Sequence, residues 1–224
     1  MRNLTGIGRS YEWEQGMDQR NGDERVQSVE ARTETNLILA SASPRRAELL
    51  RQLGLRFQVQ PADIDEAIGK NESPDDYVRR LAVEKAEAIS LVSGGVVLGA
   101  DTVVVHRNLI LGKPYNPQGA REMLRALSGS WHEVYTGTAL VTDATRSSVT
   151  RTKVKFKAIS DREVERYLET GEPFDKAGAY GIQGIGSLFV ERIEGSYSNV
   201  MGLPLYETEA LFLESGESVW TWRR

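Results

Sequence analysis

The chain has 224 residues, of which 40% are hydrophobic and 27% are charged, a balance that is ordinary for a globular protein. Its formal net charge of −4 argues against a nucleic-acid partner. The absence of cysteine excludes disulfides, zinc–thiolate sites and a cysteine nucleophile, and it is typical of a cytoplasmic protein.

The first part of the chain differs in composition from the rest. Residues 1–35 carry mixed charges and glycines, with no hydrophobic period and no apolar segment typical of a signal peptide. We expect them to form a disordered extension, followed by one domain over residues 36–224. No apolar run approaches the roughly 20 residues that span a bilayer, so we expect no membrane partner.

The pattern from residue 36 onward alternates between strands and helices. Apolar or alternating runs predict strands at 36–40, 56–60, 96–106, 131–143, 147–159 and 188–195. Amphipathic segments with Ser, Asn or Pro at their starts predict helices at 43–54, 73–94, 116–129, 160–173 and 203–215. This alternation predicts an α/β fold with a mixed central sheet flanked by helices.

The first predicted helix begins with an unusual charge pattern, in "LILASASPRRAELL" over residues 37–50. Arg45 and Arg46 stand where the helix dipole is already positive, which favours a bound anion. Ser41 and Ser43 add hydroxyl donors, so the segment is typical of a phosphate or polyphosphate site. The alternative is an ordinary capped helix whose two arginines are solvated and bind no ligand.

Two further charged residues interrupt apolar patterns. Asp101 lies inside an apolar strand, where a carboxylate is costly unless it is paired or bound to a metal, so it is the best catalytic candidate. Thr102 beside it fits either a site or an ordinary strand. Lys85 shares a helix face with Leu81 and Ile89, so it either extends to water or points into a cleft toward an anion.

Three loop residues are weaker candidates. Glu66 could join Asp101 on a divalent cation, although most loop acids are merely solvated. Lys113, in "LGKP", is ordinary surface chemistry when taken by itself. Gln183 lies in the glycine-rich stretch 176–187 and could read a base edge with its amide, although a plain flexible loop is the alternative.

Taken together, these stretches resemble the Maf family of nucleoside triphosphate pyrophosphatases. The motifs occur in family order as "SASPRRAELL", "DE", "EKA", "GADT", "GKP", "KAGAYGIQG" and "GLPL", and they span residues 36–213. The resemblance implies an inosine-triphosphatase-like α/β fold with two lobes around a cleft, and a homodimer. It also implies a Mg²⁺- or Mn²⁺-dependent cleavage that yields a nucleoside monophosphate and pyrophosphate.

The resemblance also assigns roles. It makes Asp101 the proton acceptor, and we expect Asp101 to hold the metal as well, with Glu66 as a weaker candidate ligand. The cations Lys85, Lys113, Arg45 and Arg46 would neutralise the triphosphate, and Ser41 would contact it.

Three residues place the chain within one group of the family. Arg45, Thr102 and Gln183 match members that act on dTTP and UTP, whereas members acting on 7-methyl-GTP tend to carry Trp, Gln and Glu there. Two alternatives stay open. One is hydrolysis of modified pyrimidine nucleotides, and the other is a nucleotide-binding regulator of cell division with little catalysis.

Overall fold

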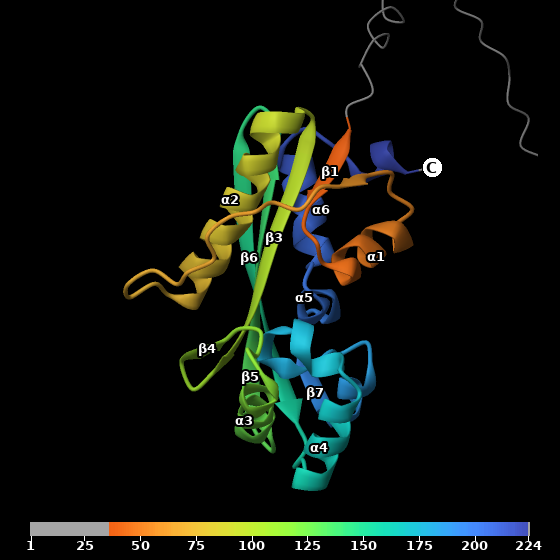
Figure 1. Ribbon diagram of the computed structural model, residues 1–224. Helices are drawn as coiled ribbons and strands as arrows, with labels where there is room; N and C mark the ends of the chain where they lie inside the picture. Colours follow the sequence, from red (N-terminus) through yellow and green to blue (C-terminus); the bar gives the residue numbers. More distant parts are fainter. Residues whose placement is uncertain (1–35, 224) are drawn as a thin grey trace, which may run out of the picture. The chain divides into compact units, whose positions relative to one another are not determined.

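The computed structural model describes residues 36–223, and the expected disordered extension over residues 1–35 lies outside them. Within the described part, the chain forms a mixed seven-stranded sheet with helices on both faces (Figure 1). The strands are β1 (Leu37–Ala40), β2 (Gln58–Val59), β3 (Val96–His106), β4 (Leu109–Leu111), β5 (Trp131–Val141), β6 (Thr145–Phe156) and β7 (Val190–Glu194). The predicted fold class is therefore confirmed.

The strand order β2-β1-β3-β5-β6-β7 divides the sheet into a parallel part and an antiparallel part. β1 is parallel to both β2 and β3, and the remaining neighbours, including β4 on β3, are antiparallel. β3 is predicted to the residue, because most of its residues are apolar or β-branched. β4 is not predicted, since its three residues are too few to show a period.

Helices cover both faces of the sheet, and most begin at the predicted caps. They are α1 (Pro44–Gln52), α2 (Pro74–Ser93), α3 (Pro117–Leu127), α4 (Asp161–Glu169), α5 (Tyr197–Met201) and α6 (Leu205–Glu214). The glycine-rich stretch contains the short 3₁₀ turns η2 (Ala177–Ala179) and η3 (Ile185–Phe189), after η1 (Glu172–Asp175), and η4 (Val219–Trp222) ends the described chain. None of the helices within residues 36–223 is long and apolar enough to cross a membrane.

The alternation of side chains along β3 decides what each helix packs against. Val97 and Val103 face α2, whereas Leu98 and Ala100, in the alternate phase, belong to the cluster on the opposite face, which includes residues of α1, α5 and α6. By this alternation, Asp101 lies on the side of β3 that faces α2, whereas Thr102 lies on the side that faces α1. Asp101 and Thr102 therefore belong to opposite faces of the sheet at the same level.

The edge of β3 beside these two residues has no neighbouring strand within the described part. β1 ends where Ala40 pairs with Gly99, and β4 begins its pairing with β3 at Val104. This interruption leaves residues 100–103 paired with β5 alone. The chain leaving β1 turns away here into α1, and ligands of open α/β sheets commonly bind at such a point.

Two glycines let α2 approach the sheet closely. A Cβ on Gly99 would collide with the carbonyl oxygen of Ala82, and a Cβ on Gly137 would collide with that of Val78. Both carbonyls belong to the backbone of α2, which cannot move aside as a side chain would. The approach brings the long side chains of α2 to the level of Asp101.

We expect Gly137→Ala to lower the free energy of unfolding by about 2 kcal/mol or more, because the added methyl group forces α2 off the sheet. Urea unfolding followed by circular dichroism measures the change. Gly119→Ala, where a Cβ would meet its nearest atom at 3.6 Å, is the matched control and should not destabilise. Equal midpoints for Gly137→Ala and the unsubstituted chain would contradict the close approach.

Candidate active site

A cleft of about 1050 Å³ opens at the interrupted edge of β3. One wall consists of the chain from β1 into α1 and the segment before α2. The other wall includes the turn after β4 and the chain around η2. Eight predicted site residues line it, namely Ser41, Arg45, Arg46, Glu66, Lys85, Asp101, Thr102 and Lys113. Gln183 is exposed and is not among the lining residues, although Gly181 and Ile182 next to it are.

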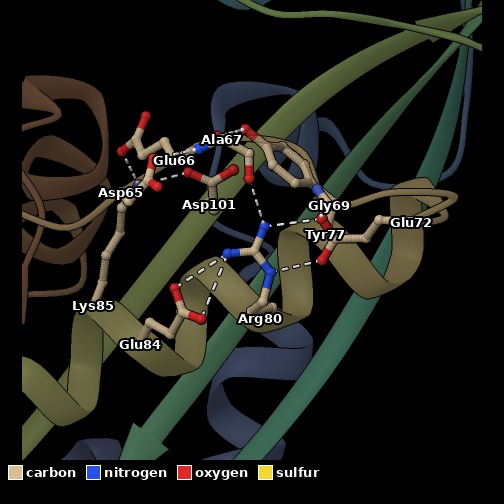
Figure 2. A network of polar contacts seen from close by, with 10 residues as sticks. All are labelled: Asp65, Glu66, Ala67, Gly69, Glu72, Tyr77, Arg80, Glu84, Lys85 and Asp101. Carbon is tan, nitrogen blue, oxygen red and sulfur yellow. Dashed lines mark hydrogen bonds and ion pairs between the residues drawn. The ribbon is translucent and has the colours of Figure 1, made fainter.

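Lys85 joins two carboxylates at the floor of the cleft. Its Nζ lies 2.7 Å from Asp101 Oδ1 and 2.6 Å from Glu66 Oε1 (Figure 2). Lys85 and Asp101 are each only 8% exposed, while the Glu66 side chain is about half exposed. Of the two arrangements that the sequence left open, Lys85 therefore points into the cleft.

The three groups differ in their electrostatic surroundings. Burial raises the pKa of Asp101, and the nearby charges of Lys85 and Arg46 offset only part of that effect. Partial burial alone would raise the pKa of Glu66, but its hydrogen bond to Lys85 and the charge of Lys113 lower it overall. Asp101 is consequently the carboxylate that takes up a proton more readily, which suits a proton acceptor.

Arg46 is held by three hydrogen bonds inside the protein. Its guanidinium donates to Gly202 O at 2.7 Å, to Ser41 Oγ at 2.8 Å and to Thr102 Oγ1 at 2.9 Å. Burial lowers the pKa of Arg46, and the Asp101 charge opposes that shift. Arg46 thus connects the start of α1 to β3 and to the end of α5. The sequence predicted a contact with phosphate for Arg46 but not this structural role.

Arg45 and Lys113 differ from Arg46 in that their side chains are not hydrogen-bonded into the described part of the fold. Arg45 is half-buried and Lys113 is exposed, and neither side chain makes a hydrogen bond or ion pair within residues 36–223. Both line the cleft from opposite walls. They are therefore the cations best placed to contact an anionic ligand.

The donor set suits a divalent cation that a ligand helps to bind. Asp101 and Glu66 contact the same Nζ, so their carboxylates lie close enough together to share one ion. Among the described residues, no group of three or more histidine, cysteine or acidic side chains could hold a metal. Mg²⁺ is commonly held by one or two carboxylates together with water and substrate phosphates. The two carboxylates fit that pattern.

Two cleft residues were missed from the sequence. Tyr77 lines the cleft and donates from its hydroxyl to Glu66 O at 2.9 Å. It lies eight residues before Lys85, on the same helix face, so the period that identified Lys85 also contained Tyr77. Lys176 lines the cleft as well and donates to Glu172 O at 2.7 Å. It begins "KAGAYGIQG", but nothing in the spacing gave it a role.

The sequence of this chain is similar to those of known proteins over most of its length. The model of a family described as Maf-like protein matches residues 36–215. A dTTP/UTP pyrophosphatase of Hahella chejuensis is 51% identical over 190 residues, covering 83% of this chain and 94% of that protein. A dTTP/UTP pyrophosphatase of Anaeromyxobacter dehalogenans is 53% identical over 185 residues, covering 80% and 94%. The solved Ham1 protein of Staphylococcus aureus is 12% identical, with a TM-score of 0.41 over 54% of this chain and 71% of that chain.

The two adjacent arginines should respond differently to substitution. We expect Arg46→Gln to lower the free energy of unfolding by about 2 kcal/mol, because it leaves several buried acceptors without a donor. Arg45→Gln should change it by less than about 0.5 kcal/mol, as is usual for a side chain without partners in the fold. Chemical unfolding of both variants measures the difference. Equal losses would contradict the assignment of Arg46 to the fold and of Arg45 to the ligand.

Proposed function

Because the chain belongs to the Maf family, we propose that it hydrolyses dTTP and UTP to the nucleoside monophosphate and pyrophosphate. The observation that carries the proposal is the buried Asp101, ion-paired with Lys85 in a cleft whose walls carry unpartnered cations. Relatives about half identical in sequence bear the name of this activity.

The cations of the cleft can bind the triphosphate. Arg45 and Lys113 reach it from opposite walls, and the first turn of α1 adds backbone N–H groups with partial positive charge. Ser41 already accepts hydrogen bonds from Arg46 and from the Ser43 amide, so its own hydroxyl proton can be donated to a phosphate oxygen. Holding the phosphates against fixed donors supplies most of the catalysis expected in phosphoryl transfer.

Asp101 can act as the proton acceptor of the reaction. A water oxygen attacks the α-phosphorus while Asp101 accepts one of its protons, and the bond from the α-phosphorus to the α,β-bridging oxygen breaks. The nucleoside monophosphate keeps the new oxygen, and pyrophosphate leaves with the bridging oxygen. Lys85 keeps Asp101 oriented and balances its charge, since its Nζ lies 2.7 Å from Asp101 Oδ1.

A divalent cation, Mg²⁺ or Mn²⁺, would be held by Asp101 and Glu66. When bound, it withdraws charge from the phosphoryl oxygens and favours an attacking hydroxide. Asp101 would help to hold the cation and would also accept the proton, while its Oδ1 contacts Lys85.

Specificity for thymine and uracil would come from Arg45, Thr102 and Gln183. Thr102 is fixed by Arg46 and by Thr136, whose Oγ1 lies 2.9 Å from its own. Gln183 is exposed and follows directly after Gly181 and Ile182, which line the cleft. The proposal also includes a homodimer in the cytoplasm without nucleic-acid or membrane partners, supported by the family resemblance and the net charge of −4.

Pyrophosphate release with Mg²⁺ or Mn²⁺ tests the proposed function. We expect release from dTTP and UTP well above that from CTP, GTP, ATP and 7-methyl-GTP, and a loss of at least about 100-fold in Asp101→Asn, because a general base is removed. Faster release from 5-methyl-UTP or pseudo-UTP would point to modified nucleotides. Tight binding of dTTP without release of pyrophosphate would replace the enzyme by a nucleotide-binding regulator.

The raised pKa of Asp101 predicts where activity is lost in acid. Because the carboxylate must be ionised to accept a proton, kcat/KM should fall as the pH drops through a value above about 3.9, the ordinary pKa of aspartate. Lys85→Gln removes a charge that lowers this pKa, so its acid limb should move to still higher pH. Lys113→Gln is the control and should move it less. A wild-type limb below pH 3.9 would contradict the assignment.

A further inference from the structure

Glu66 lies on a segment that has no secondary structure of its own. Between β2 and α2, residues 60–73 form neither helix nor strand, and most of the side chains from Asp65 to Lys70 are exposed. Such a segment would move freely unless other parts of the chain held it. The position of the Glu66 carboxylate therefore depends on what fixes its backbone.

Arg80, on α2, holds this segment at two places. Its Nε and Nη2 donate to the two carboxylate oxygens of Glu72 at 2.7 and 2.8 Å, and Nη2 also donates to Ala67 O at 3.0 Å (Figure 2). Its Nη1 lies 3.2 Å from Glu84 Oε2 on the next turn of the helix. One guanidinium thus ties the residue after Glu66, and the end of the segment, to α2.

Neighbouring hydrogen bonds complete the attachment. The Tyr77 hydroxyl donates to Glu66 O at 2.9 Å, and the Arg80 guanidinium lies over the Tyr77 ring at 5.6 Å. The Glu72 carboxylate also accepts from the Gly69 amide at 2.7 Å. The carbonyl oxygens of two consecutive residues, Glu66 and Ala67, are therefore bound by side chains that lie three residues apart on α2.

The Arg80–Glu72 contact has the geometry of a strong ion pair. Two parallel N–H···O bonds to one carboxylate add directional specificity to the charge attraction, which a lysine could not supply. The hydrogen bonds from Arg80 lower the pKa of Glu72 to about 2, so Glu72 stays ionised at neutral pH. The pair is consequently intact wherever the proposed enzyme would work.

We propose that Arg80 is a positioning residue for the active site, which acts through Ala67 and Glu72 to hold the Glu66 carboxylate where it meets Lys85 and a divalent cation. Arg80 is not among the residues that line the cleft, so it acts on the site through this segment. The inference rests on the proposed function for its catalytic meaning, but its effect on metal binding is independent of hydrolysis.

Mn²⁺ binding to the full chain without nucleotide, followed by electron paramagnetic resonance, tests the proposal. Residues that orient metal ligands typically contribute about 10- to 100-fold to affinity, so Arg80→Gln should weaken Mn²⁺ binding by about that factor. Hydrogen exchange at the Ala67 and Gly69 amides should accelerate in the same variant. Arg80→Lys should weaken binding too, since it keeps the charge without the two-pronged contact.

A matched control is the neighbouring arginine. Arg79 donates to Ser147 and makes no hydrogen bond or ion pair with residues 60–73, so Arg79→Gln removes the same charge and should leave Mn²⁺ binding and amide exchange unchanged. Glu72→Gln should weaken binding as Arg80→Gln does, and the double variant should be no worse than the single ones.

The possible outcomes separate this inference from the proposed function. Unchanged Mn²⁺ binding in Arg80→Gln would overturn the inference, as would a wild-type chain that binds no Mn²⁺. If Arg80→Gln loses Mn²⁺ binding while the wild-type chain releases no pyrophosphate, the inference is supported and the proposed function is contradicted. In the dTTP assay, we expect Arg80→Gln to raise the metal concentration needed for half-maximal rate far more than it lowers kcat.

Discussion

The candidate site depends on one buried ion pair between α2 and β3. Lys85 and Asp101 are both nearly inaccessible to solvent, and a buried charge is tolerated only when a partner compensates it. The pair therefore requires α2 to lie against the sheet, which Gly99 and Gly137 permit. It also requires an opening at the level of Asp101, because Glu66 shares the same ammonium group while remaining half exposed to the cleft.

The two arginines at the start of α1 show how one motif serves both the fold and the ligand. Arg46 lies three and four residues before the buried Leu49 and Leu50, so it belongs to the face of α1 that packs on the sheet. Arg45 precedes the exposed Glu48 by three residues and lies toward the cleft wall. The two cations at this helix start thus differ, because Arg46 is hydrogen-bonded within the protein and Arg45 is left for a ligand.

Sequence patterns predict most of the helices and strands, and eight of the nine candidate site residues line one cleft. Asp101 was found because a charge interrupts an apolar strand, and Lys85 because it shares a period with Leu81 and Ile89. The same reasoning could have placed Arg46 inside the fold, from the spacing to Leu49 and Leu50. The pairing of Lys85 with Asp101 could not be predicted, because it depends on how closely α2 packs against the sheet, which the side-chain period of neither element gives.

The segment that carries Glu66 was beyond prediction for a related reason. Residues 60–73 have no period, and Arg80 fixes them through Glu72, which precedes α2 and so lies outside any helical spacing rule. An i,i+4 rule finds only the Arg80–Glu84 pair, which is the longer of the two contacts. The role of Gln183 stays a prediction, since the loop that carries it is exposed at that residue.

The interrupted edge of β3 has a consequence for association. A stretch of strand without a neighbour, such as residues 100–103 in the described part of the chain, is a template onto which another extended chain can add. Here the stretch carries Asp101, and the side chains of Lys85 and Arg46 lie next to the stretch. An incoming strand would therefore have to bury several charges. The charges of the site therefore also protect the molecule from aggregation through this edge.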